Sequence, residues 1–317
     1  MLKFNIAKEK GYVGKYYLIF FIYLIFPEIV YCQGIQIDGS GGGLIAFYSE
    51  RKTVQSAEIF IMNADGSGLK QLTDNTFDDS TPSLSPDGTK ILFSSTPSDQ
   101  SDIYSMNIDG SEVRQLTYSA EGNEYHAEWS PDQSMIVYTV FSSGSWTQSD
   151  IFLMYADGNG KIQLTDHPGN DMRPSFSPDG KLIIFNSNRD GNVEIYTMKP
   201  DGSEVKRLTN TPLFEYFPMI SPDGKKIVYT LFDPDKRTAD IYVMNMDGTE
   251  NIKLTFKGRI NEDARWSPDG GYIIFQSERT GWYQIFIMDA NGDNQRCLSD
   301  NTGNDYWPCW SRYEYIK

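Results

Sequence analysis

The sequence predicts an all-β fold, a six-bladed β-propeller of four-stranded antiparallel blades, and three observations predict it. A Ser-Pro-Asp phrase recurs along the 317 residues at intervals of 44 to 47 residues, which indicates an array of similar units. Short runs of apolar and aromatic residues follow each phrase, and tight-turn dipeptides separate them. The copies are Ser85-Pro-Asp-Gly88, Ser130-Pro-Asp-Gln133, Ser177-Pro-Asp-Gly180, Ser221-Pro-Asp-Gly224, Ser267-Pro-Asp-Gly270 and a degenerate Trp310-Ser311-Arg312.

The order of motifs within each unit predicts four strands, named A to D. Strand A ends at Ser-Pro-Asp-Gly, where Pro presets a turn dihedral and Gly releases the chain. An apolar run such as Ile91–Phe93 makes strand B, and Asp102-Ile-Tyr-Ser-Met106 illustrates strand C. An Asp-Gly turn such as Asp109-Gly110 then leads to strand D, which closes on Leu-Thr or Leu-Ser.

The first and last units are incomplete in complementary ways. The first begins at strand B, Leu44–Tyr48, and the chain ends on a lone strand A, Asp305–Ser311. The last strand is therefore expected to complete the first blade and close the ring, which removes exposed sheet edges. The propeller is expected to occupy residues 44–317 after a short linker, 33–43, and to be a monomer.

The N-terminus is typical of an export signal. Four Lys precede the apolar run Tyr16–Phe26, which is too short to span a bilayer as a helix but suits a signal-peptide core. Residues 1–32 are thus expected to be cleaved, giving a periplasmic or secreted protein with no membrane insertion afterwards. Lipidation of Cys32 is the alternative, although the bulky Tyr31 before it argues against a lipoprotein anchor; an uncleaved anchor ranks third.

The charge of the chain excludes two classes of partner, and its cysteines bear on disulfide formation. The formal net charge is −15, and residues 1–32 carry four Lys and two Glu, which leaves −17 for the remainder. Such a surface repels nucleic acid and anionic membranes. Cys297 and Cys309 fall on outer and inner strands of different blades, so two free thiols are expected.

The repeated motifs resemble those of the TolB-like propeller family, whose units read P-x-W-S-P-D-G-K-x-I-x-F followed by D-I-Y-x-M and L-T. The resemblance covers residues 44–311. It implies a channel mouth that receives envelope proteins, including a peptidoglycan-associated lipoprotein. TolB also carries an N-terminal α/β domain, which this chain is expected to lack, and seven residues after Trp310 leave no room for a peptidase domain.

One face of the ring is expected to carry binding. The A–B and C–D turns are uniform, whereas the B–C and D–A loops on the other face vary, from Ser187–Asn192 to Phe141–Ser149. Variable loops on a rigid scaffold favour binding. The channel candidates are the strand-A residues four or two positions before the Ser, where the copies disagree: His126, Glu128, Arg173, Phe217, Asp263, Arg265 and Trp307. The alternatives are drift on a solvated wall, and mutual charge balance for Glu128 with Arg265.

Two further sets of residues, one acidic and one aromatic, are candidates for binding a ligand or partner. Six positions before the Ser, Asn261 is the exception in an otherwise acidic set of Asp79, Glu124, Asp171, Glu215 and Asp305. An acidic rim could attract a cation or basic peptide, but the repetition favours a structural role in which each accepts backbone N–H bonds. Trp146 and Trp282 in B–C loops could anchor a ligand or cover their own blade.

Nothing in the sequence supports catalysis, a metal or a cofactor. His126 and His167 lack metal-ligand spacing, no nucleophile elbow occurs, and Asp289–Asp293 lacks the Glu of a calcium loop. The leading hypothesis is a protein-binding propeller of the cell envelope. A glycan hydrolase or lyase is the alternative, if two channel carboxyls face each other about 5–10 Å apart across an open pocket. A sugar-binding module on Trp146, Trp282 and Trp307 is a third.

Overall fold

The computed structural model describes residues 43–51, 56–98, 100–118, 122–256, 259–299 and 302–311. These belong to one compact unit. The expected signal peptide, including Cys32, and nearly all of the expected linker lie outside the described residues and stay predictions. No helix in the described part of the chain is long and apolar enough to cross a membrane.

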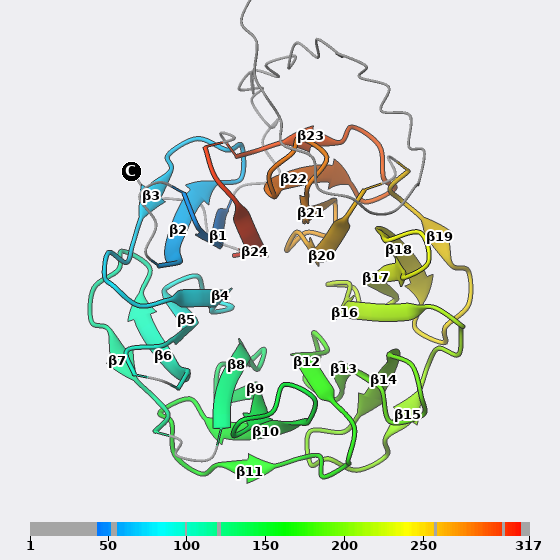
Figure 1. The fold of residues 1–317 in the computed structure, drawn as a ribbon, viewed down its shortest axis with the longest axis horizontal. Helices are drawn as coiled ribbons and strands as arrows, with labels where there is room; N and C mark the ends of the chain where they lie inside the picture. Colours follow the sequence, from blue (N-terminus) through cyan, green and yellow to red (C-terminus); the bar gives the residue numbers. More distant parts are fainter. Residues whose placement is uncertain are drawn as a thin grey trace, which may run out of the picture. The chain divides into compact units, whose positions relative to one another are not determined.

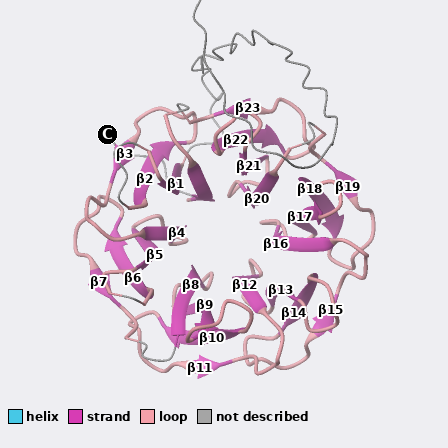
Figure 2. Cartoon of the chain, in the orientation of Figure 1, coloured by secondary structure: helices cyan, strands magenta, loops and turns pink. Residues whose placement is uncertain are grey.

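The described residues form six four-stranded antiparallel sheets arranged around a central channel (Figures 1 and 2), which confirms the predicted fold class. Blade 1 contains β24 (Asp305–Trp310), β1 (Leu44–Ser49), β2 (Glu58–Asn63) and β3 (Lys70–Gln71). Blade 2 contains β4 (Asp79–Leu84), β5 (Lys90–Ser95), β6 (Asp102–Asn107) and β7 (Arg114–Gln115). Blade 3 contains β8 (Gly122–Trp129), β9 (Met135–Ser142), β10 (Ser149–Tyr155) and β11 (Ile162–Gln163).

The other three blades repeat the same order from the channel outward. Blade 4 contains β12 (Asp171–Phe176), β13 (Ile183–Ser187), β14 (Glu194–Met198) and β15 (Lys206–Arg207). Blade 5 contains β16 (Phe214–Ile220), β17 (Lys226–Asp233), β18 (Thr238–Asn245) and β19 (Ile252–Lys253). Blade 6 contains β20 (Asn261–Trp266), β21 (Tyr272–Ser277), β22 (Gln284–Asp289) and β23 (Arg296–Cys297).

The ring closes as the incomplete end units predict. Strand β24 pairs antiparallel with β1, with Ile45 opposite Trp310 and Ser49 opposite Asp305. Every inner strand therefore has a partner on its outward side. The first blade is completed by the last strand of the chain, and this hydrogen-bonded closure ties the two ends of the propeller together.

The core lies between neighbouring sheets. Between blades 2 and 3, Leu92 and Ile103 pack with Trp129, Ile136 and Tyr138, which are at most 7% exposed. Fully burying one such apolar side chain contributes roughly 1.5–3 kcal/mol. Trp129 is the residue directly before a repeat Ser, and its side chain packs between the two blades.

The Pro-Asp-Gly turn is fixed by its own side chains. In the first copy the Ser85 hydroxyl donates to Asp87 Oδ1 at 2.6 Å and accepts from Lys90 N at 2.9 Å. Gly88 N donates to Ser85 O at 2.8 Å, and Gly88 has a φ of 69°. Gly is favoured there because it adopts positive φ without steric cost.

Cys297 lies in the outer strand β23 and Cys309 in the inner strand β24, and the two form no disulfide with each other. This agrees with the expectation from the repeat layout.

Candidate functional site

All six channel-lining strands carry the same β-bulge. Their registers to the neighbouring strand B shift at one place, between the residues five and two positions before the repeat Ser. The residue four before the Ser has a left-handed backbone in every blade: Thr81 (φ 48°), His126 (58°), Arg173 (58°), Phe217 (55°), Asp263 (52°) and Trp307 (58°). Such φ values are rare for bulky residues, and a bulge re-aims the side chain.

In two of the six blades, a polar side chain of the preceding blade holds the bulge. Arg173 N donates to Thr139 Oγ1 of β9 at 3.1 Å, and Trp307 N donates to Gln276 Oε1 of β21 at 2.7 Å. The backbone N–H that the bulge withdraws from the sheet ladder is thus satisfied across the blade boundary.

Four of the seven predicted channel residues meet in one aromatic and cationic cluster, which we call the channel cluster: His126, Arg173, Phe217 and Trp307. The His126 ring stacks on Trp307 with centroids 5.2 Å apart and planes 16° apart. The Arg173 guanidinium lies 3.5 Å from the Phe217 ring centroid and 4.3 Å from that of Trp307. The Phe217 and Trp307 rings meet edge to face at 5.7 Å. Because blades 1, 3 and 5 are not neighbours, these contacts cross the channel.

The other three predicted residues form an ion-pair network, Glu128–Arg265–Asp263. Arg265 Nη1 lies 3.4 Å from Glu128 Oε2, and Arg265 Nε lies 3.5 Å from Asp263 Oδ1. The Ser175 hydroxyl donates to Glu128 Oε1 at 2.9 Å. Two carboxylates therefore flank a guanidinium, as the charge-balance alternative predicted for Glu128 and Arg265.

Several buried polar atoms in the channel lack a hydrogen-bond partner among the described residues. They are Asp263 Oδ1 and Oδ2, Arg173 Nη1, His126 Nδ1 and Arg265 Nε. Buried polar groups are nearly always satisfied by protein or by water. Arg265 Nε and Asp263 Oδ1 meet only in their ion pair, and the other three atoms have no polar partner among the described residues.

Burial sets the protonation of this region. It lowers the pKa of His126 well below its usual value, and the positive charges of Arg173 and Arg265 lower it further. Burial also lowers the pKa of Arg173 to about 10, and it raises the pKa of Glu128 and of Asp263. His126 is therefore neutral at pH 7, and Arg173 stays charged.

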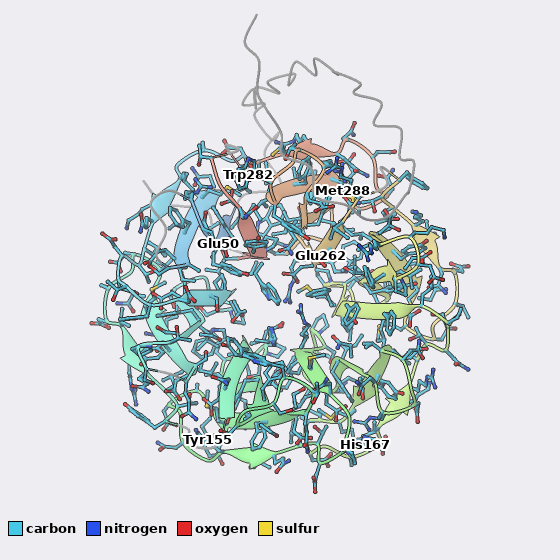
Figure 3. The ribbon with its side chains drawn as sticks, viewed as in Figure 1. Glu50, Tyr155, His167, Glu262, Trp282 and Met288 are labelled. Carbon is cyan, nitrogen blue, oxygen red and sulfur yellow. The ribbon has the colours of Figure 1, made fainter. Side chains whose placement is uncertain are left out.

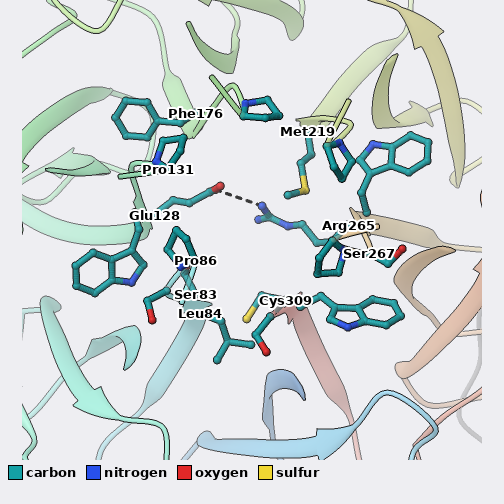
Figure 4. A pocket seen from close by; sticks show the side chains of 18 of the residues that line it. Ser83, Leu84, Pro86, Glu128, Pro131, Phe176, Met219, Arg265, Ser267 and Cys309 are labelled. Atoms are coloured by element: carbon teal, nitrogen blue, oxygen red, sulfur yellow. Dashed lines mark hydrogen bonds and ion pairs between the residues drawn. The ribbon is translucent and has the colours of Figure 1, made fainter. Parts of the chain in front are cut away.

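The seven residues divide between the two ends of the channel, which corrects the placement of all seven at one mouth. Strand A runs from the D–A loop face to the Pro-Asp-Gly face, so the channel cluster lies nearer the variable loops. A small cavity of about 30 Å³ separates it from the residues two before the Ser. Those residues, Glu128 and Arg265 among them, line a pocket of about 330 Å³ at the Pro-Asp-Gly end (Figure 4).

The acidic residues six before the Ser do not form an exposed rim. Asp79, Glu124, Asp171, Glu215 and Asp305 are at most 2% exposed. Among the described residues, the carboxylates of these five residues contact other side chains rather than the backbone N–H groups that the sequence suggested. Arg51 Nη2 donates to Asp305 at 2.7 Å, Arg189 Nη2 to Asp171 at 2.7 Å, and Thr211 Oγ1 to Glu215 at 2.9 Å. Asn75 Nδ2 donates to Asp79 at 2.7 Å, and Lys161 Nζ lies 3.5 Å from Glu124.

Sequence reasoning missed the residues five before the Ser. Tyr125 lies 6.0 Å from both His126 and Trp146 in ring centroids, and Tyr306 lies 5.2 Å from Tyr48. Strict strand alternation places this position away from the channel, and the bulge returns it to the mouth. Tyr in three of the six copies was the available signal.

The loop aromatics lie on the variable face as predicted. Trp146, in the β9–β10 connection, is 64% exposed and packs on Phe141 of its own blade at 5.3 Å. Trp282, in the β21–β22 connection, is 53% exposed (Figure 3). Glu262 lies beside the channel, whereas His167 lies at the outer edge, where its Nδ1 accepts from Gly169 N at 3.2 Å.

Two arrangements that the enzymatic alternative would use, a cluster of metal ligands and two carboxyls facing each other across an open pocket, are not seen in the part of the chain that the structure describes. No group of three His, Cys, Asp or Glu there could hold a metal ion. Asp263 is fully buried, and Arg265 lies between it and Glu128. This differs from two carboxyls facing each other across an open pocket, the arrangement that glycoside hydrolysis requires.

Comparisons with known proteins agree with this architecture. The family model described as "TolB beta propeller domain" matches residues 40–148, 129–238 and 217–314. A "Protein TolB homolog" of Chlorobium luteolum is 33% identical over 270 residues, which are 85% of this chain and 60% of that protein. The chain therefore spans about three fifths of that relative's length.

Solved structures show the same fold. Acinetobacter baumannii TolB matches with a TM-score of 0.77 and 23% identity over 86% of this chain and 68% of its own. An oligogalacturonate lyase of Vibrio parahaemolyticus matches with a TM-score of 0.55 and 17% identity, over 80% of this chain and 78% of its own. Since a lyase is among the neighbours, the fold alone does not determine the function.

Proposed function

Because the chain belongs to the family of TolB β-propeller domains, we propose that it is a protein-binding module of the cell envelope, exported by residues 1–32. A segment of a protein partner enters the channel mouth on the face of the B–C and D–A loops. There it contacts the channel cluster, with Tyr125, Trp146 and Tyr306 at the margin. The family and the names of the relatives support the class of function.

The observation that carries the proposal is the channel cluster itself. Trp, Tyr and Arg are the residues most enriched at the energetic centres of protein interfaces. Here Arg173 is held between Phe217 and Trp307 while its Nη1 lacks a hydrogen-bond partner. A carbonyl or carboxylate of the partner would satisfy that N–H, and an apolar side chain would cover the rings.

The glycan hydrolase or lyase is the second candidate, and the site favours it less. Its catalytic residues would be Asp263, Glu128, His126 and Arg173. Asp263 is fully buried, and His126 is held neutral by burial. The likeness to an oligogalacturonate lyase concerns the fold alone.

The experiment is a crosslinked pull-down from envelope extract with the exported chain and two variants. Trp307→Asn with Arg173→Gln removes the ring and the charge, and Asn tolerates the left-handed backbone at position 307. Tyr155→Ala is the control, since Tyr155 is 56% exposed at the outer edge of blade 3. All forms must show the same cooperative melting.

We expect one protein to be captured by the unmodified chain and by the Tyr155→Ala control, and to be lost with the double variant. Equal capture by all three forms would move the binding site away from the channel cluster. Capture of nothing, with glycan cleavage or glycan binding by the same sample, would replace protein binding with the glycan alternatives.

A further inference from the structure

The pocket at the Pro-Asp-Gly end of the channel has rigid walls that present both apolar rings and polar groups. Its volume of about 330 Å³ lies within the range of small-molecule sites, roughly 300–1,000 Å³. Proline rings from the repeated turns of five blades line it, together with the Trp residues that precede the repeat Ser: Pro86, Pro131, Pro178, Pro222, Pro268, Trp129, Trp266 and Trp310. Proline has a fixed φ, so the walls are preformed.

The inner end of the pocket is charged. Glu128 and Arg265 extend toward each other from opposite sides of the channel (Figure 4), and each side chain is 21% exposed. Arg265 Nη1 and Glu128 Oε2 are 3.4 Å apart, longer than the roughly 2.7–2.9 Å of a strong charge-assisted hydrogen bond. The pair is thus incompletely closed, and both charges face the pocket.

Glu128 and Arg265 each also contact a second side chain, which fixes their position. The Ser175 hydroxyl donates to Glu128 Oε1 at 2.9 Å, and Asp263 Oδ1 lies 3.5 Å from Arg265 Nε. Neither side chain has to be repositioned by a ligand for its remaining atoms to be available. Met219 and Cys309 complete the lining beside them.

We propose that this pocket binds a small zwitterion, an α-amino acid with an apolar side chain. Its carboxylate pairs with Arg265, its ammonium pairs with Glu128, and its side chain lies against Met219 and the proline and tryptophan walls. This site is separate from the proposed protein-binding mouth and stands without it.

The charges discriminate between ligand classes. A ligand with only a carboxylate would compete with Glu128 for Arg265 and leave Glu128 without its counter-charge, which is strongly unfavourable. A ligand with only an ammonium would engage Glu128 and leave Arg265 with Asp263 alone. A neutral apolar ligand would gain only contact with the walls. A zwitterion supplies an opposite charge to each of the two side chains, so it is the class of ligand that satisfies both groups.

The test is calorimetric titration of the exported chain with L-leucine and L-phenylalanine, beside N-acetyl-L-leucine and L-leucinamide. The acetyl form lacks the ammonium and the amide form lacks the carboxylate. We expect both free amino acids to bind, and each blocked form to bind about tenfold more weakly or worse, since an unpaired charged partner costs at least 1.4 kcal/mol, about a factor of ten.

Two variants place the site. Met219→Trp fills the pocket while keeping both charges, and it should abolish binding of L-leucine. Glu128→Gln keeps the Ser175 contact but removes the charge, and it should abolish the preference for L-leucine over N-acetyl-L-leucine. Tyr155→Ala, at the exposed outer edge of blade 3, is the control and should bind L-leucine unchanged.

The proposal is overturned if no free amino acid binds to the folded chain. It is also overturned if the blocked forms bind as tightly as L-leucine, or if Met219→Trp binds L-leucine like the unmodified chain. Failure of the pull-down on the other face would leave these titrations unaffected, because they use only the chain and the defined amino acids.

Discussion

The blade boundaries and the channel use repetition in opposite ways. At every boundary a Thr or Ser that closes strand D accepts a backbone N–H from strand C of the same blade, at 2.8 to 3.0 Å in all six blades. A carboxyl or amide from strand C and one from the next strand A lie beside that hydroxyl, as Asp240 and Asn261 do beside Thr255. Here the side chains themselves repeat.

The channel repeats only its backbone. Six left-handed bulges carry six different residues, among them Thr81, Phe217 and Asp263. Buried boundary groups must satisfy one another, which restricts them to a few hydrogen-bonding types. The bulge requires no particular side chain, so the channel residues can differ, and their differences report on what the channel contacts. Identical residues thus mark the scaffold, and an identical backbone with different residues marks the site.

The largest expected effect is on a buried boundary ion pair. Asp171→Ala removes the carboxylate that accepts from Arg189 at 2.7 Å, where the two side chains are 0% and 14% exposed. Breaking such a pair costs about 3–5 kcal/mol, because the remaining charge stays buried. Denaturant unfolding measures it. The exposed pair Lys181–Asp179 is the control, and Lys181→Ala, which leaves the hydrogen bond from Ser177 to Asp179 intact, should cost about 0–1 kcal/mol. An equal loss of stability in the two variants would contradict the claim that the buried ion pair contributes more than the exposed one.

A second prediction concerns the boundary between blades 4 and 5, where Glu194 and Glu215 meet. Burial, and then a hydrogen bond with Glu194, raise the pKa of Glu215 from 4.5 to about 8. Between pH 4.5 and about 8, Glu215 keeps a proton in the folded state that it has released in the unfolded state. The stability that this proton contributes is therefore fully present below pH 4.5 and is lost as the pH rises through about 8.

Raising the pH from 5 to 9 should thus lower the free energy of unfolding. One pKa unit corresponds to about 1.4 kcal/mol, and relaxation around the ionised pair reduces the total, so we expect a loss on the order of 2–3 kcal/mol. Glu215→Gln needs no proton, as Asn261 needs none at the next boundary, and it should remove most of this dependence. Denaturant unfolding at several pH values provides the measurement, and an unchanged slope in the variant would exclude Glu215 as its source.

The fold could be predicted from the sequence because its signals repeat. Five copies of Ser-Pro-Asp and a degenerate sixth, in phase with Asp-Gly and Asn-Gly turns, leave one architecture, and the offset of Leu44 and Trp310 predicts the closure that β24 and β1 form. The sequence did not predict that outer strands such as Lys70–Gln71 have only two residues. The strand ends early because the Thr73 hydroxyl, rather than a backbone carbonyl, accepts Ile59 N at 2.9 Å.

The site could be predicted only in part. Disagreement between copies pointed to His126, Arg173 and Trp307, and the structure brings their side chains together. The bulge itself leaves no mark in the sequence, since no Gly occupies its position. The candidates were chosen four and two positions before the Ser, so Tyr125, five before it, was missed. Glu128 was placed with the other six at one mouth, although it lines the pocket at the Pro-Asp-Gly end.

The smallest expected effect tests the bulge directly. In a regular strand, Gly is less stable than Ala by about 0.5–1 kcal/mol. At Phe217, with a φ of 55°, Ala keeps the steric cost of a left-handed backbone and Gly does not. Phe217→Gly should therefore be more stable than Phe217→Ala by about 1 kcal/mol. Ile184, buried in the regular strand β13, is the control and should show Ala above Gly. Denaturant unfolding of the four variants decides it. If the Ala variant is the more stable one at both positions, the backbone at Phe217 is not left-handed in solution. The channel would then lack the repeated bulge on which its comparison with the blade boundaries depends.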